Sequence, residues 1–140
     1  MKFKDYFSLK HILFALLLFA VLIPFVIRDS NKQVRVSFDA SSVSISSKKY
    51  SMTVRYDDIN SASLTDLAEP GEELADAYDD DILHAGVWKN DVWGEYHIAA
   101  DLDTTNCIKI QLKDGRIFVF SSVDNDTTAA HFETLQSHLS

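Results

Sequence analysis

The chain opens with an apolar stretch unlike anything that follows it. Residues 12–27, ILFALLLFAVLIPFVI, contain no charged residue and would extend about 24 Å as a helix. Lys10, His11 and Arg28 flank the stretch. Long basic side chains can reach the headgroups, which makes up the difference from a hydrocarbon layer of roughly 30 Å. The stretch therefore predicts a transmembrane helix.

A cleaved signal peptide is the alternative for this stretch. Cleavage needs small residues three and one positions before the cut, and after Ala20 the chain reads VLIPFVIRDS, without such a pair. We therefore expect a single-pass anchor in the cell membrane, with residues 1–32 as tail, helix and juxtamembrane linker. Three basic residues lie close to each end of the span, so orientation rests on the short amino-terminal tail, which favours an extracytoplasmic domain.

After residue 32 the hydrophobic pattern changes to strict alternation, which is typical of half-buried strands. It predicts three early strands, marked by Val34, Val36 and Phe38, by Val43 and Ile45, and by Met52, Val54 and Tyr56. Later strands are predicted at residues 62–64, 85–89, 94–100, 107–113 and 116–121. Asp114-Gly115 between the last two is a strong hairpin signal. Residues 66–81, DLAEPGEELADAYDDD, are acidic with a Pro-Gly pair and predict a long loop.

The end of the chain has a helical period. One face collects four apolar residues, and an aspartate precedes them as a candidate amino-terminal cap, either Asp124 or Asp126; the apolar residues are Ala129, Phe132, Leu135 and Leu139. We therefore predict a mainly β domain over residues 33–140, with about seven antiparallel strands closed by one carboxy-terminal helix.

This order of elements resembles the bacterial pleckstrin-homology domain family over residues 34–139. The likeness rests on four segments: YSMTVRYDDINSASL, GVWKNDVWGEYHI, CIKIQLKDGRIFVFS and DNDTTAAHFETLQSHL. It implies a small barrel of pleckstrin-homology type with a capping helix, in a family where membrane segments beside the domain are common. It does not bring a phosphoinositide site, because an early hairpin here carries no basic cluster beyond Lys48 and Lys49.

Charge narrows the range of partners. Residues 1–32 have a net charge of +3 and the remainder −11, which gives −8 for the whole chain. Such an acidic domain repels phosphate backbones, so we expect no nucleic-acid partner. The single cysteine, Cys107, excludes an intramolecular disulfide and lies in the apolar phase of a strand, so we expect it to be buried.

Residues capable of catalysis or metal binding are scattered. The acidic residues Asp76, Asp79, Asp80 and Asp81 offer oxygen ligands, but the run lacks the glycine and bidentate glutamate of a calcium loop. His84 and His97 have no partner in a metal-binding spacing, and no G-x-S-x-G motif occurs. We therefore expect no enzyme activity, no metal and no cofactor.

Trp88, Trp93 and Tyr96 are the candidate binding residues, because tryptophan and tyrosine are favoured anchors at protein interfaces. The competing interpretation places the tryptophans in the core, most clearly Trp88, which continues a strand. We expect a membrane-tethered, non-enzymatic binding or scaffold module for a protein partner. Two alternatives stay open: a metal-assisted hydrolase using the acidic loop and His84, and a structural element that associates with its own copies through a strand edge.

Overall fold

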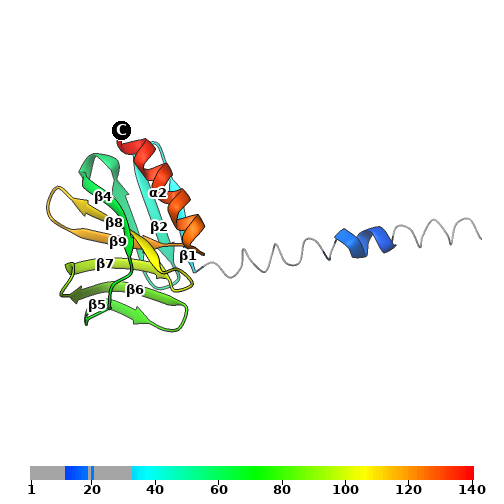
Figure 1. The fold of residues 1–140 in the computed structure, drawn as a ribbon, viewed down its shortest axis with the longest axis horizontal. Helices are drawn as coiled ribbons and strands as arrows, with labels where there is room; N and C mark the ends of the chain where they lie inside the picture. The colour runs from blue at the N-terminus through cyan, green and yellow to red at the C-terminus, as the bar shows by residue number, and fades with distance from the viewer. Residues whose placement is uncertain (1–11, 19, 21–32) are drawn as a thin grey trace, which may run out of the picture. The chain divides into compact units, whose positions relative to one another are not determined.

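The computed structural model describes residues 12–18, 20 and 33–140 (Figure 1). The chain divides into two units, Met1–Lys32 and Gln33–Ser140, and each is described by itself.

In the first unit, residues 12–18 and residue 20 are helical. Within the described ranges, no helix has both the length and the apolar character needed to cross a membrane. Residue 19 and residues 21–27 of the predicted span lie outside the described residues. The structure therefore contradicts the predicted transmembrane helix and the single-pass membrane location, and the extracytoplasmic placement of the domain loses the helix on which it rested.

The second unit begins with a three-stranded antiparallel sheet in the order β1-β2-β3. Its alternating pattern puts one face into the core: Val43 pairs with Val54 and Ile45 with Met52, and all four are buried. The three strands predicted from this alternation are confirmed; they are β1 (Val34–Phe38), β2 (Ser42–Ser47) and β3 (Ser51–Arg55).

A short 3-10 turn, η1 (Tyr56–Asp58), leads into a six-stranded sheet. The strand order is β4-β8-β9-β7-β6-β5. Neighbours are antiparallel except for β7 and β9, which are parallel. The strands are β4 (Ile59–Asp66), β5 (Glu72–Asp79), β6 (Leu83–Asn90), β7 (Gly94–Asp101), β8 (Asn106–Leu112) and β9 (Ile117–Ser121).

The fold class therefore needs correction. The described residues are mainly β with one carboxy-terminal helix, as predicted, but they form nine strands in two sheets instead of about seven antiparallel strands in one barrel. The acidic segment 66–81, predicted as a loop, contains β5. Its first five residues are exposed, so it has no apolar alternation, and it is held by backbone pairing with β6. The predicted hairpin at Asp114-Gly115 is confirmed between β8 and β9.

Both faces of the six-stranded sheet are covered. On β7, His97 and Ala99 point to one face, and Tyr96 and Ile98 to the other. The first face packs on the three-stranded sheet in the main core, which includes Ala99. The second face carries a smaller cluster of buried residues, here called the outer cluster: Trp88, Trp93, Tyr96, Ile98, Ala100, Cys107 and Val119.

Residues 67–71, here called the strap, cover the outer cluster. They link β4 to β5, the two opposite edges of the sheet, and Figure 1 shows this connection running across the sheet. Leu67 and Ala68 pack on the outer cluster. Tyr96 Oη donates to the Pro70 carbonyl at 2.7 Å, and Asn90 Nδ2 donates to the Glu69 carbonyl at 3.0 Å. These contacts make the outer face of the sheet a second, separate core.

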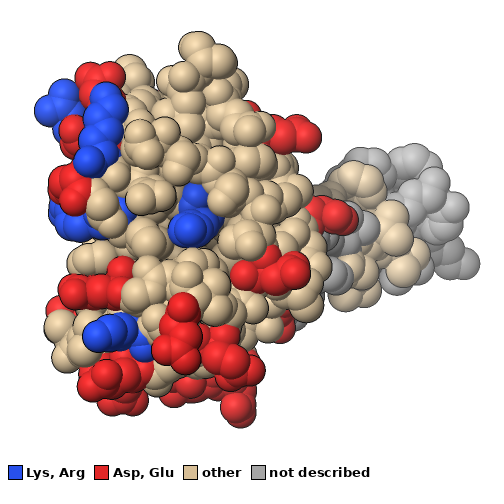
Figure 2. Space-filling view, turned by 60° about the vertical axis from the view of Figure 1, so that its left-hand side comes forward, with Lys and Arg blue, Asp and Glu red and all other residues tan. Residues whose placement is uncertain are grey.

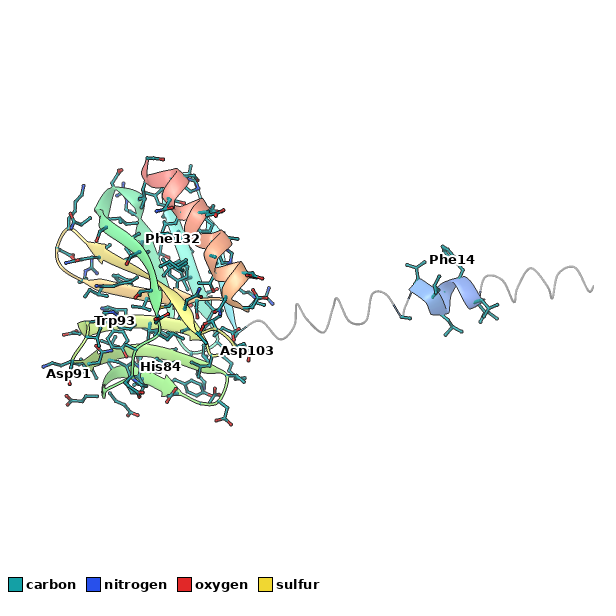
Figure 3. The ribbon with its side chains drawn as sticks, viewed as in Figure 1. Phe14, His84, Asp91, Trp93, Asp103 and Phe132 are labelled. Atoms are coloured by element: carbon teal, nitrogen blue, oxygen red, sulfur yellow. The ribbon has the colours of Figure 1, made fainter. Side chains whose placement is uncertain are left out.

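Helix α2 (Asn125–Leu139) packs against β4 and β8. Asp124 is its amino-terminal cap, because its side chain accepts a hydrogen bond from Thr127 N at 2.7 Å. On the predicted apolar face, Leu135 is fully buried, Phe132 is half-buried against the main core (Figure 3), and Leu139 is 38% exposed. The helix and its cap are confirmed, and its apolar contact centres on Leu135.

Candidate functional site

The three predicted binding residues all lie in the outer cluster. Trp88 is 4% exposed, Trp93 9% and Tyr96 0%. The rings of Trp93 and Tyr96 meet edge to face with centroids 5.0 Å apart, and Trp88 Nε1 donates to the Ala85 carbonyl at 2.8 Å. Burial of Trp88 in the core is confirmed. A role of the three residues in binding stays a prediction, and in this structure their side chains support the strap.

His84 lies on β6 next to Trp88, with ring centroids 4.4 Å apart. Its Nδ1 is 3.3 Å from Asp79 Oδ1, without the alignment of a good hydrogen bond. Its Nε2 is 3.4 Å from Tyr96 Oη, and that hydroxyl donates to the Pro70 carbonyl. A row of neighbouring polar groups therefore runs from Asp79 through the buried imidazole and Tyr96 to the strap.

Burial decides the protonation states of His84 and Tyr96. It lowers the pKa of His84 below its ordinary value, and the Asp79 carboxylate offsets only part of that effect. It also raises the pKa of Tyr96 to about 12. At neutral pH the imidazole is therefore neutral, and the tyrosine keeps the proton that it donates to the strap. The thiol of Cys107, fully buried as predicted, is likewise protonated, because burial raises its pKa to about 12.

Lowering the pH from about 7.5 to about 5.5 is expected to reduce the free energy of unfolding. The unfolded chain takes up the His84 proton near its ordinary pKa of about 6.5, whereas the folded chain resists it. The stability contributed by the neutral, buried imidazole is therefore fully present above about pH 6.5. As the pH falls from there toward the lower pKa of the folded state, the free energy of unfolding decreases by at most about 1.4 kcal/mol per pH unit for one group. Urea unfolding over this pH series should give a flatter dependence for His84→Gln.

Two other groups set the limits of that test. Burial also lowers the pKa of His97, so His84→Gln keeps a residual slope of the same sign. Burial raises the pKa of Asp101, and its contribution to the pH dependence has the opposite sign, because the folded carboxyl takes up its proton more readily than the unfolded one. A slope identical in the parent chain and His84→Gln would contradict the assigned burial of this histidine.

Asp101 has a structural role that the sequence did not reveal. The residue is 2% exposed, and its carboxylate accepts backbone hydrogen bonds from Gln33 at 3.5 Å, Asp103 at 3.1 Å and Val123 at 3.3 Å. It thereby joins the residues just before β1 and α2 to the end of β7. No local pattern in the sequence marked Asp101 as buried.

The predicted acidic loop is built into the β5–β6 hairpin. Asp79 pairs with His84, and Asp80 caps the turn by accepting from Ile82 N and Leu83 N, both at 2.8 Å. Tyr78 Oη also donates to Asp80, and this bond lowers the pKa of the carboxyl. Among the residues that the structure describes, no group of three or more His, Cys, Asp or Glu side chains is placed to hold a metal ion.

The charge of the chain is concentrated around this hairpin. Residues 69–95 contain nine acidic residues and one lysine, a net charge of −8 that equals the formal charge of the whole chain. In Figure 2 acidic side chains gather toward the lower part of the domain and basic ones mostly toward the upper part. These residues extend along the β5–β6 edge of the sheet, from the strap and the β6–β7 turn to the β5–β6 turn, and we call them the acidic corner: Glu69, Glu72, Glu73, Asp76, Asp79, Asp80, Asp81, Asp91 and Glu95.

A groove of about 450 Å³ opens within the acidic corner, between the end of the strap and the β6–β7 turn. The turn is fixed by Asn90, whose Oδ1 accepts from Val92 N at 3.1 Å and Trp93 N at 2.7 Å, and Figure 3 shows Asp91 and Trp93 at this end of the strands. Val92 is 70% exposed at the groove. The groove is lined by Glu69, Gly71, Glu72, Lys89, Asn90, Asp91 and Val92.

Comparison with known proteins gives no relative: no family model matches the chain, and no curated protein or solved structure is significantly similar to it. The resemblance to bacterial pleckstrin-homology domains therefore stays a prediction.

Proposed function

We propose that residues 33–140 form a non-enzymatic binding module, and that its acidic corner receives a basic segment of a protein partner. The observation that carries the proposal is the placement of charge: a net −8 within residues 69–95, and a net charge of zero for all other residues of the chain taken together. A field concentrated in this way attracts a basic partner and orients it during encounter.

Apolar groups within the corner support binding rather than solubility alone as its role. Val92 at the β6–β7 turn is 70% exposed and Leu74 on β5 is 45% exposed, while Ile82, 42% exposed, lies in the β5–β6 turn at the other end of β6. Exposed apolar side chains among these charges provide apolar surface that a partner can cover, so they add binding energy after electrostatic attraction has brought the partner close. The groove beside Val92 has a frame fixed by Asn90, so little ordering is needed when a side chain enters it.

The position of His84 favours binding over the hydrolase alternative. One ring nitrogen faces Asp79 and the other faces Tyr96 inside the outer cluster, and only 4% of the residue is exposed. A general base has to reach the proton that it removes, and this imidazole is turned away from solvent.

Charge reversal in the corner is expected to weaken binding of a basic peptide. The probe is a synthetic peptide of alternating lysine and leucine, titrated against the full chain at low and moderate salt. Glu72→Lys with Asp91→Lys replaces two attractions by two repulsions at the groove, so affinity should fall about tenfold or more. Binding should also weaken with salt, because the contacts are exposed.

The matched control is Asp57→Lys with Asp103→Lys, which changes the net charge equally at exposed positions outside residues 69–95. It should reduce affinity far less than the corner variant. A peptide of alternating glutamate and leucine should not bind. Equal losses in the two double variants would mean that only total charge matters, and the proposed site would be wrong.

A further inference from the structure

The two edges of the six-stranded sheet differ in how they meet solvent. At one edge, β5 carries four acidic residues, has two shifts in its pairing with β6, and includes Asp76 at a φ of 51°. Charges and bulges are the usual means by which proteins prevent an edge strand from pairing with another chain. The β5 edge is therefore protected.

The β4 edge has these features only at its two ends, as a shift in its pairing with β8 between Ile59 and Ser61 and as the charge of Asp66. Residues 60–65, NSASLT, are uncharged and contain no proline. Pairing with β8 runs without a shift from Ser61 to Asp66. In the described part of the chain no backbone group outside the sheet bonds to residues 60–65, so the outer hydrogen-bonding groups of a regular strand stay open. An edge of this kind can accept another strand.

A groove lies beside this edge, at Ala62, on the side of α2. It measures about 540 Å³ and lies between Ala62 of β4 and the last turns of the helix, where Leu139 lines it. Leu64, on the same face of β4 as Ala62, and Leu139 of α2 are each 38% exposed. A strand added at β4 would therefore meet apolar surface as well as open backbone groups.

We propose that β4 pairs with β4 of a second copy of this chain, antiparallel and centred on Ser63. In this register Ser63 faces its own equivalent, and Ala62 faces Leu64 of the second copy, beside the groove. Ser61 faces Thr65, so the regular part of the strand pairs uncharged residues of similar size. The segment is thus complementary to itself, which a two-fold interface requires.

Electrostatics permits this pairing in spite of the net charge of −8. The acidic corner begins at β5, the opposite edge of the sheet, about 24 Å away at five strand spacings of about 4.8 Å. Joined at β4, the two corners lie at opposite ends of a continuous sheet, far beyond the Debye length of about 8 Å. The pairing also leaves the acidic corner open, so it does not depend on the proposed function.

Cysteine cross-linking of the full chain tests the register. The Cα atoms of directly opposite residues in an antiparallel pair are about 4.5–5.5 Å apart, which suits a disulfide, and the native Cys107 is buried. Ser63→Cys should form a disulfide-linked dimer about tenfold faster or more than Ser51→Cys, an exposed position on the edge strand β3, because pairing raises the local thiol concentration.

A charge at the same position tests the interface itself. Ser63→Lys puts two like charges opposite each other, so the mass in solution should fall from twice 15.8 kDa to that of one chain, with an unchanged cooperative melt. Ser51→Lys should keep the mass of the parent. Equal cross-linking at both positions, a single-chain mass for the parent, or a dimer that survives Ser63→Lys would overturn the proposal.

Discussion

Replacing Leu135 by alanine is expected to lower the free energy of unfolding by about 2–5 kcal/mol, the usual cost of emptying a buried leucine site. Leu135 is fully buried and is the residue of α2 that belongs to the main core together with residues of both sheets. Small domains are stable by about 5–15 kcal/mol, so this single change removes a large share. Urea unfolding of the full chain, followed by tryptophan fluorescence, gives the value.

Two other helix positions make this test specific. Glu133 is exposed, so Glu133→Ala should change stability by less than about 0.5 kcal/mol. Phe132 is half-buried, and Phe132→Ala should fall between the two. If Leu135→Ala costs as little as Glu133→Ala, helix α2 is not docked on the sheets.

The strands with one buried face were predictable because alternation reports burial. In β2 and β3, Val43, Ile45 and Val54 are buried between exposed or half-buried polar residues, and their pattern led directly to the correct elements. β5 was missed for the converse reason. Glu72 and the four residues after it are all exposed, and an edge strand held by backbone pairing leaves no apolar period in the sequence.

Strand neighbours were less predictable than the strands themselves. The pattern in β7 and β9 shows which side chains are buried. Their parallel pairing depends on the tertiary arrangement of strands that are separated by β8 in the sequence, and a local pattern does not report it. The strap is a further example. Leu67 and Ala68 cover the outer cluster, yet two apolar residues beside a Pro-Gly pair are indistinguishable from an ordinary loop.

The same limit applies to the candidate site. Trp93 follows a turn, and its sequence position left open whether it is exposed or buried; the residue is 9% exposed and lies in the cluster that the strap covers. The concentration of acidic residues was visible in the sequence. Its gathering at one edge of the sheet results from the pairing of β5 with β6, which places the start of the acidic strand beside the β6–β7 turn.

Gly86→Ala is expected to lower the free energy of unfolding by about 2–5 kcal/mol, through backbone strain of about 1–2 kcal/mol and overpacking of about 1–3 kcal/mol. Gly86 has a φ of +104°, and a Cβ there would lie 2.3 Å from the Asp76 carbonyl oxygen and 2.8 Å from Ala77 Cα. These are backbone atoms of the neighbouring strand, so no side-chain rotation relieves the clash. The β5 strand would have to move away from β6.

Gly115→Ala separates strain from clash. Gly115 also has a positive φ, +95°, but a Cβ added there would meet no atom within 4 Å, so only the strain of about 1–2 kcal/mol should appear. The excess cost of Gly86→Ala in urea unfolding therefore measures the contact between β5 and β6. Hydrogen exchange should locate the change, with faster exchange in β5 than in β8. If the two glycine variants are equally destabilised, β5 does not pair at this point of β6, and the acidic corner loses the strand that organises it.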